Sequence, residues 1–280
     1  MRLLVPPFLI AALLAGFGCG GSGGYGSAPE DELSLEAGAG ISATEQGAET
    51  TGEAADGNVD TFTAADLPIE AGHELQFSSN RPGTTTQVSF NLEGPWKFSS
   101  GPDQETLTVS MMPKESGFSS DEFPDAQVAA GSSWSTSTDL IEYSFQSKDD
   151  NSWMAYGRSD EDGRIVTYTR ASRAMVFPMT VGDSWVDGYT EVENGRSTDI
   201  IAENAVIARN RLTVPAGSFD AYLLQTKVKA KPRGKPETTT LDYSWFVPGV
   251  GRAAEIISVP DENGELFSTA SAFYRLKSYR

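Results

Sequence analysis

Apolar residues recur at every second position over much of the chain after residue 67, the spacing of a β-strand with one buried face. Runs with this alternation cover residues 88–92, 107–111, 141–145, 224–228 and 241–247. We expect each run to be a strand of an antiparallel sheet, with its apolar face buried and its polar face in water.

Turn signals separate these runs. Glycine ends polar or acidic clusters at residues 159–163, 193–195 and 261–264, and residues 231–236 alternate basic side chains with proline and glycine. Residues 199–209 fit either a strand or a short helix. No βαβ rhythm occurs. We therefore predict a mainly β fold, a single domain over residues 67–280 built on a large antiparallel, curved or half-barrel sheet with little helix.

The N-terminus has the pattern of an export signal. Arg2 precedes an apolar run over residues 3–15, which is shorter than the roughly 20 residues of a membrane-spanning helix. Residues 15–19, Ala-Gly-Phe-Gly-Cys, resemble the lipobox of bacterial lipoproteins and contain the only cysteine. The resemblance implies that residues 1–18 are a signal peptide and that Cys19 carries the lipid. The alternative is ordinary secretion with a free thiol.

Two further expectations concern the residues after Cys19. Gly20 is not acidic, so an outer-membrane lipoprotein is expected, with its domain in the periplasm or at the cell surface. Residues 19–66 consist largely of Gly, Ser, Ala, Thr and acids, and no Lys or Arg occurs between Leu3 and Asn80. We expect a disordered acidic linker with a reach of roughly 35–40 Å. It serves as a spacer or, alternatively, as an acidic partner-binding tail.

Five sequence motifs follow one another in the domain, at residues 94–99, 123–126, 177–185, 212–222 and 245–251. The later motifs resemble the TapB-like family of uncharacterised bacterial envelope proteins, and the earlier motifs resemble related modules in secreted proteins of gliding bacteria. The resemblance implies an antiparallel β fold like that of the lipoprotein carriers LolA and LolB, and it implies no catalytic residues.

Charge and composition argue against several kinds of partner and catalytic site. The net charge of −18 argues against a nucleic-acid partner. His73 is the only histidine, so a Ser-His-Asp triad and a zinc site are not expected. Residues 160–163 are similar to part of a calcium loop, but Arg158 stands where a ligand is needed. A pair of carboxylates for glycoside cleavage stays open. We expect no cofactor, no metal and no enzyme activity.

Two groups of side chains are candidates for binding. The five tryptophans are either core or an aromatic platform for a sugar or an acyl chain; they are Trp96, Trp134, Trp153, Trp185 and Trp245. A dense basic stretch is either a contact for an anionic surface or a guard against edge pairing; it contains Lys227, Lys229, Lys231, Arg233 and Lys235.

The function expected from these features is binding rather than catalysis. We predict a lipid-anchored extracytoplasmic binding or accessory protein that contacts the membrane through its anchor and takes an unknown protein, glycan or lipid partner. The alternative is a carrier or chaperone for a lipid or an acylated protein, and a hydrolase ranks third.

Overall fold

The computed structural model describes residues 61–280, apart from residue 263. The predicted signal peptide, Cys19 and the predicted linker up to residue 60 lie outside the described residues. Three short 3-10 turns and fourteen strands make up the described elements. The 3-10 turns are η2 (Ala64–Asp66), η3 (Lys114–Ser116) and η4 (Ser120–Glu122). The strands are β1 (Glu74–Ser79), β2 (Thr86–Gln87), β3 (Trp96–Lys97), β4 (Glu105–Pro113), β5 (Val128–Trp134), β6 (Ser137–Lys148), β7 (Ser152–Asp160), β8 (Ile165–Val176), β9 (Ser184–Glu193), β10 (Arg196–Val214), β11 (Gly217–Pro232), β12 (Thr238–Val247), β13 (Gly251–Ser258) and β14 (Thr269–Tyr279).

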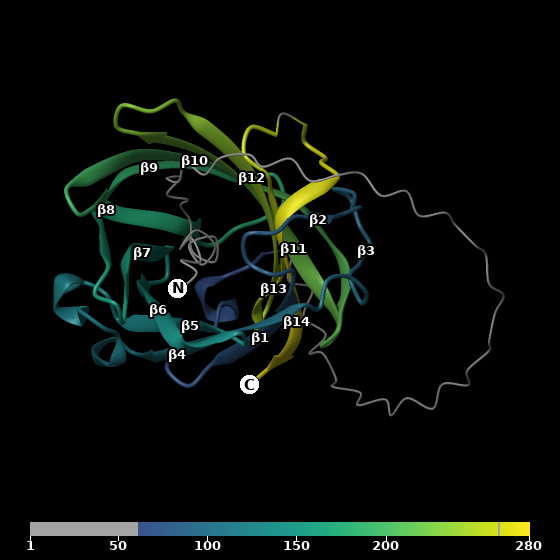
Figure 1. The fold of residues 1–280 in the computed structure, drawn as a ribbon. Helices are drawn as coiled ribbons and strands as arrows, with labels where there is room; N and C mark the ends of the chain where they lie inside the picture. The colour runs from purple at the N-terminus through teal and green to yellow at the C-terminus, as the bar shows by residue number, and fades with distance from the viewer. Residues whose placement is uncertain (1–60, 263) are drawn as a thin grey trace. The chain divides into compact units, whose positions relative to one another are not determined.

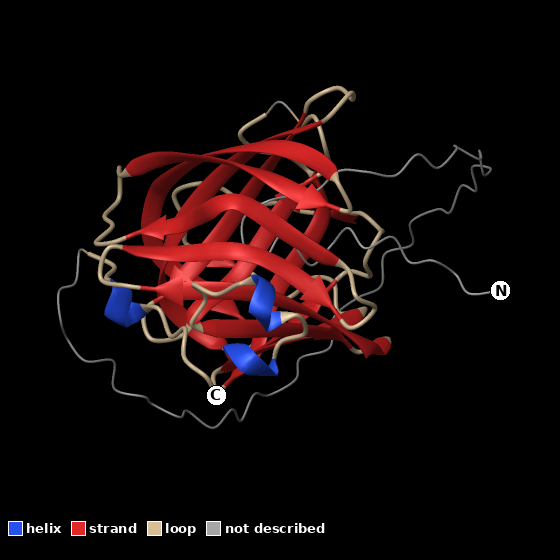
Figure 2. Cartoon of the chain, turned by 90° about the vertical axis from the view of Figure 1, so that its left-hand side faces the viewer, coloured by secondary structure: helices blue, strands red, loops and turns tan. Residues whose placement is uncertain are grey.

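The sheet closes on itself. From β4 to β14 each strand pairs antiparallel with the next, and β1 pairs with both β4 and β14. The described strands thus form a closed antiparallel barrel of twelve strands, with β2 and β3 added at its margin (Figures 1 and 2). The predicted fold class is confirmed. The sheet is a full barrel because the first and last long strands are neighbours, a pairing that local alternation does not reveal.

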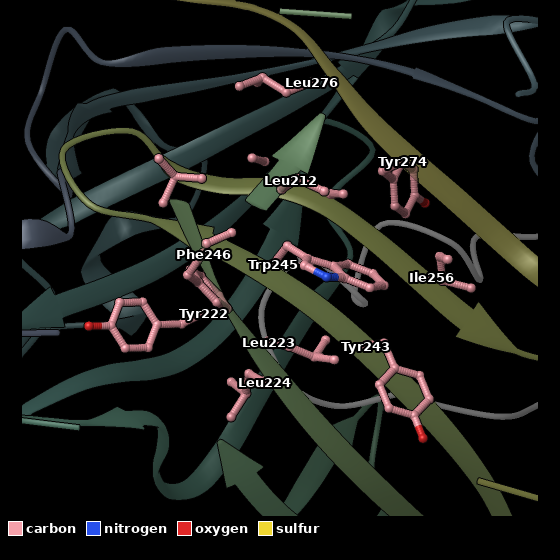
Figure 3. Packing of buried hydrophobic residues seen from close by; sticks show 14 of the residues in the cluster. Leu212, Tyr222, Leu223, Leu224, Tyr243, Trp245, Phe246, Ile256, Tyr274 and Leu276 are labelled. Atoms are coloured by element: carbon pink, nitrogen blue, oxygen red, sulfur yellow. The ribbon is translucent and has the colours of Figure 1, made fainter. Parts of the chain in front are cut away.

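Part of the barrel wall, around Trp245 on β12 and along β13, is buried on both faces. There the outer face is covered by the segment that runs from β2 to just beyond β3. Phe98 of this segment packs against Trp245 and Phe273, with ring centroids 4.9 and 5.2 Å apart, and Phe90 lies 5.1 Å from Tyr243. Trp245 sits among side chains from β10 to β14 (Figure 3). Since both faces are covered, every residue of β13 is buried.

The covering segment differs from the prediction. Residues 88–92 alternate apolar and polar, yet they form no strand among the described residues. Phe90 contacts the rings of Tyr243, Trp245 and Phe267 instead. The alternation therefore reflects an extended segment lying on a sheet, which buries one side of the segment as a strand would.

The N-terminal segment closes one end of the barrel core. Phe62 is fully buried, and its ring lies 5.5 Å from that of Tyr222 on β11 and 6.5 Å from that of Phe246 on β12. Its backbone pairs with Met179 in an isolated antiparallel bridge. The folded unit therefore starts near residue 60, and the predicted boundary at Leu67 falls inside it.

Polar side chains face the interior along part of the wall. On β12 the outward residues Tyr243 and Trp245 lie under the covering segment, whereas Asp242, Ser244 and Phe246 point inward. The inward direction follows from Phe246, whose ring meets that of Trp153 on β7 at 6.4 Å across the barrel. The predicted strand over residues 241–247 is confirmed, but its polar face lines the barrel interior.

The pairing between β8 and β9 is short. It covers three residue pairs, from Val166 with Glu193 to Tyr168 with Glu191. Beyond them, side chains join the two strands. Asp187 accepts a hydrogen bond from the backbone N–H of Arg173 at 3.0 Å, and Trp185 Nε1 donates to the Arg173 carbonyl at 3.3 Å. We call this stretch of the wall the β8–β9 seam. Within the part of the chain that the structure describes, no helix is long and apolar enough to cross a membrane.

Candidate functional site

A groove of about 730 Å³ lies on the outer face of β9 to β12, beside the connection between β13 and β14. One row of cross-strand neighbours forms part of its floor: Val186, Glu203, Lys227 and Leu241, one from each strand. With strands about 4.8 Å apart, this row is about 14 Å wide. A groove of this volume falls within the range of small-ligand sites, roughly 300–1,000 Å³.

The β13–β14 connection forms one wall and is tied to the floor. The Tyr243 hydroxyl donates to the backbone carbonyl of Glu265 and accepts a hydrogen bond from Gln225 Nε2 at 2.5 Å. Burial raises the pKa of the Tyr243 phenol, so it stays protonated and keeps donating at neutral pH. The wall thereby brings Glu262 and Glu265 to the groove.

Charge is divided between the floor and the wall. Lys229 donates a hydrogen bond to Glu203, which lowers the pKa of that carboxyl and raises the pKa of the lysine. Lys227 is exposed and forms no ion pair with any described residue. On the wall, half-buried Glu262 and exposed Glu265 form no ion pair with any described residue either. The groove therefore presents one cation on its floor and two carboxylates on the facing wall.

The structure divides the predicted basic stretch into two parts. Lys227 and Lys229 lie on the groove floor, on the outer face of β11. The other three are exposed at the β11–β12 tip, where a separate hollow of about 390 Å³ is lined by Ser197, Asp199, Lys231 and Arg233, among others. The expected placement of Lys227 and Lys229 on the solvent face is confirmed. Of the five basic residues, Lys227 and Lys229 line the groove, Lys231 and Arg233 line the tip hollow, and Lys235 lines neither.

Four of the five tryptophans are buried, which confirms the expectation of core for Trp96, Trp134, Trp153 and Trp245. Trp185 is half-buried. It packs against the core on one side, lines the groove on the other and donates to the Arg173 carbonyl across the seam. The aromatic-platform alternative therefore concerns Trp185 alone.

The two chemical motifs weighed in the sequence have structural roles. His73 Nε2 lies 3.1 Å from the Val250 carbonyl, which fixes the N-terminal segment to the β12–β13 turn. Asp160 Oδ1 accepts the backbone N–H of Arg164 at 2.9 Å and so closes the β7–β8 hairpin. No group of three or more His, Cys, Asp or Glu among the described residues could hold a metal ion.

The barrel interior holds a carboxyl pair that the sequence did not indicate. Ser244 Oγ donates to both Asp242 and Glu255 at 3.2 Å, and Arg252 Nη1 lies 2.6 Å from Glu255. Burial raises the pKa of both carboxyls, and the negative charge of Glu255 raises that of Asp242 further. One arginine balances one negative charge, so burial favours a proton on the pair.

A second interior cluster lies on β6 to β9. Arg158 Nη1 donates to Glu191 at 3.0 Å, and both side chains are buried. Glu142 is close enough to feel the charge of Arg158, yet burial dominates and raises the pKa of its carboxyl. The rings of Tyr168 and Tyr189 lie beside this cluster, 4.6 Å apart. Buried charges in both clusters are thus paired, as an interior of low dielectric constant requires.

The apolar end of the interior is densely filled. A cavity of about 40 Å³ lies beneath residues 67–69 and is lined mainly by apolar side chains, including Leu75, Trp153 and Phe246. It is far smaller than the roughly 300 Å³ at which small-ligand sites begin. This cavity therefore does not have room for an acyl chain.

Comparison with known proteins gives two structural neighbours. The fold is similar to that of a Bacteroides fragilis NCTC 9343 protein described as exported with a YmcC-like fold, at 13% identity and a TM-score of 0.40, over 76% of this chain and 98% of that one. It is also similar to a protein described as a lipoprotein from Parabacteroides distasonis ATCC 8503, at 11% identity and a TM-score of 0.37, over 76% and 97%. No family model matches the chain, so the TapB-like resemblance stays a prediction. No curated protein matches it either.

Proposed function

We propose that this chain is a lipid-anchored extracytoplasmic binding protein that holds its ligand in the outer groove and acts by binding rather than by catalysis. The observation that carries this proposal is the groove itself. It combines a volume of about 730 Å³ with one unpaired lysine and two unpaired carboxylates among the described residues. Polar groups that have no partner of their own are available to orient a ligand.

The two alternatives are less well supported by the geometry. A carrier needs an apolar cavity of lipid size, whereas the apolar cavity at the closed end of the barrel is about 40 Å³. A hydrolase could use the carboxyl pair of Asp242 and Glu255, whose raised pKa values are typical of functional carboxyls. However, both side chains point into the barrel, and Leu241 and Tyr243, on either side of Asp242, point out toward the groove side.

The anchor and location are part of the proposal. Cys19 would attach the chain to the outer membrane, with the domain in the periplasm or at the cell surface and no nucleic-acid partner. Replacing the only cysteine tests this directly: Cys19→Ser should move the protein from the membrane fraction to the soluble fraction. Unchanged membrane association of the variant would contradict the anchor.

Native mass spectrometry of protein purified from its own membrane tests the groove. The wild-type chain should carry an additional non-covalent mass. Ala205→Trp, which places a large ring in the groove lining, should remove that mass.

The matched control is Asp162→Trp, which adds the same ring at the exposed β7–β8 hairpin tip and should retain the mass. Both variants should melt within a few degrees of the wild type, since both positions lie outside the core cluster. An adduct that survives Ala205→Trp would place the ligand elsewhere and contradict the proposal.

A further inference from the structure

We propose that the ligand of the groove is an amphiphile whose headgroup carries both a phosphate and an ammonium group, as a zwitterionic phospholipid does. This inference rests on the proposed function and deepens it. It is carried by two independent features of the groove, the arrangement of its charges and the exposed apolar side chains around it.

The charges of the groove match a dipolar headgroup. Glu203 is ion-paired with Lys229 and also lies opposite Lys227 in the strand register, so these three side chains together leave one net positive charge on the floor, with Lys227 forming no ion pair with any described residue. Glu262 and Glu265 stand on the facing wall, held by the hydrogen bond from Tyr243 to the Glu265 carbonyl. A purely anionic headgroup would be repelled by the two wall carboxylates, and a purely cationic headgroup would be repelled by Lys227. A headgroup with both charges places a favourable partner on each side.

The apolar side chains supply a place for a tail. Among the described residues, Val186 is 60% exposed and lines the groove, and Ile201, 44% exposed, pairs with Lys229 on the same outer face. Leu266, 52% exposed, directly follows Glu265 on the wall. Exposed apolar residues that gather around one groove, rather than being scattered singly, mark a surface that binds apolar material. An acyl tail leaving the headgroup would cover them.

The test is isothermal titration calorimetry on the chain carrying Cys19→Ser, so that its own acyl chains do not compete. Five probes separate the headgroup from the tail, each used below its micelle concentration. Dodecylphosphocholine carries both charges and a tail, and phosphocholine lacks the tail. Dodecyl phosphate carries only negative charge on its headgroup, and dodecyltrimethylammonium carries only positive charge. Dodecyl maltoside carries none.

We expect dodecylphosphocholine to bind tightest, with each singly charged probe about threefold or more weaker, which is the range of one exposed ionic contact. Phosphocholine, without a tail, should bind much more weakly still. Lys227→Gln should weaken dodecylphosphocholine about threefold and should strengthen dodecyltrimethylammonium, whose positive charge Lys227 repels. Val186→Ser should weaken every tailed probe. Lys235→Gln removes the same charge at the β11–β12 tip and should change nothing.

Several outcomes would overturn the headgroup assignment. Equal affinity for all tailed probes would mean that the groove selects the tail alone. An equal loss for Lys227→Gln and Lys235→Gln would mean a general charge effect. If none of the probes binds while the co-purifying mass is still lost in Ala205→Trp, the groove remains the binding site and the zwitterionic amphiphile is the wrong ligand class. If the co-purifying mass is also absent, the proposed function itself fails.

Discussion

Asp242 and Glu255 share one buried site with a single compensating cation. Glu255 is completely buried, and Arg252 lies 2.6 Å from it. Tyr274 lies in the same interior region, and the nearby Glu255 charge adds to burial in raising the pKa of its phenol well above the usual range. Arg252 and the hydrogen bond from Ser244 favour the charged carboxyls, whereas burial and the charge of the neighbouring carboxyl disfavour a second negative charge. Burial is the largest effect, so the pKa of both carboxyls is raised.

Asp242→Asn should make the stability of the protein less dependent on pH. Because folding raises the pKa of Asp242, its contribution to stability is fully present below the unfolded carboxyl pKa of about 4 and is lost as the pH rises through the folded pKa. Asparagine stays neutral throughout. Urea unfolding at pH 5 and pH 8 should show wild type losing stability relative to Asp242→Asn at the higher pH.

The control for this experiment is Asp162→Asn, an exposed carboxylate at the β7–β8 tip. Its free energy of unfolding should match that of the wild type at both pH values. If Asp242→Asn also follows the wild type, the carboxyl pair does not hold a proton at neutral pH.

At the scale of the element, alternation predicted which residues share a face but not which face points inward. On β12 and β6 the apolar residues Tyr243, Trp245 and Phe145 point outward, under segments that arrive from elsewhere in the chain. Phe123 of the β4–β5 connection stacks on Phe145 at 4.1 Å. Apolar residues recur at every second position whether their face points into the barrel or lies under a loop outside it. The sequence therefore could not distinguish the two faces.

Long-range pairing also decided the ambiguous stretch. Residues 199–209 lie within β10, where they pair with β11 except at a bulge at Ile207, and with β9 as far as Ala205. The alternating apolar residues Ile200 and Ala202 fit a strand, but the isolated segment carries no turn signal that excludes a helix. Pairing with a strand on each side decides that such a segment is a strand rather than a helix. The partner strands are known only from the fold.

Among the junctions between neighbouring barrel strands that the structure describes, the β8–β9 seam has the fewest paired residues, and side chains replace the ladder there. Asp187→Ala should remove the acceptor of the Arg173 N–H and the partner that lies 2.9 Å from Arg170 Nη2. A fully buried N–H left without a partner costs about 1–3 kcal/mol. The Arg173 N–H is only partly buried, so the loss should be at the lower end of this range. Hydrogen exchange followed by mass spectrometry should show faster exchange in residues 169–176 and 184–190 before any change in β12 or β13.

Asp199→Ala provides the comparison, since Asp199 is exposed and accepts only the Thr190 hydroxyl at 2.7 Å. It should leave exchange at the seam unchanged. Uniformly faster exchange across all strands in Asp187→Ala would mean that the seam does not open separately from the rest of the barrel.

For the molecule as a whole, the candidate site could be predicted only in part. The basic residues Lys227 and Lys229 stood out in the sequence, and both lie in the groove. Val186 and Glu265 gave no signal, because each is an ordinary residue of a strand or a loop. They reach the groove only when β9 and the β13–β14 connection, about 80 residues apart in the chain, come to the same face.

The start of the folded unit can be tested by truncation. A chain beginning at Asp60 should melt at the same temperature as one beginning at Cys19. A chain beginning at Leu67 loses Phe62, which is fully buried against Phe177, Tyr222 and Phe246, and should be less stable by about 3–5 kcal/mol. Differential scanning calorimetry measures both.

Phe62→Ala in the longer chain should reproduce most of that loss, whereas Phe118→Ala, at an exposed position, should cost little. Equal melting temperatures for the chains beginning at Asp60 and Leu67 would mean that residues 60–66 contribute nothing to the fold.

The pairing of β1 with β14 has a consequence for how the chain matures. The backbone N–H of Glu74 donates to the Arg280 carbonyl at 2.9 Å, and the backbone N–H of Arg280 donates to the Glu74 carbonyl at 3.0 Å. The junction that closes the barrel therefore joins residues about 200 positions apart in the chain. When the chain emerges N-terminus first, β14 is the last strand of the barrel to appear. Until then β1 and β13 each present an open edge, which invites pairing with other chains. Chaperone demand should therefore be greatest just before β14 emerges, and premature termination before β14 should yield aggregates rather than a smaller barrel.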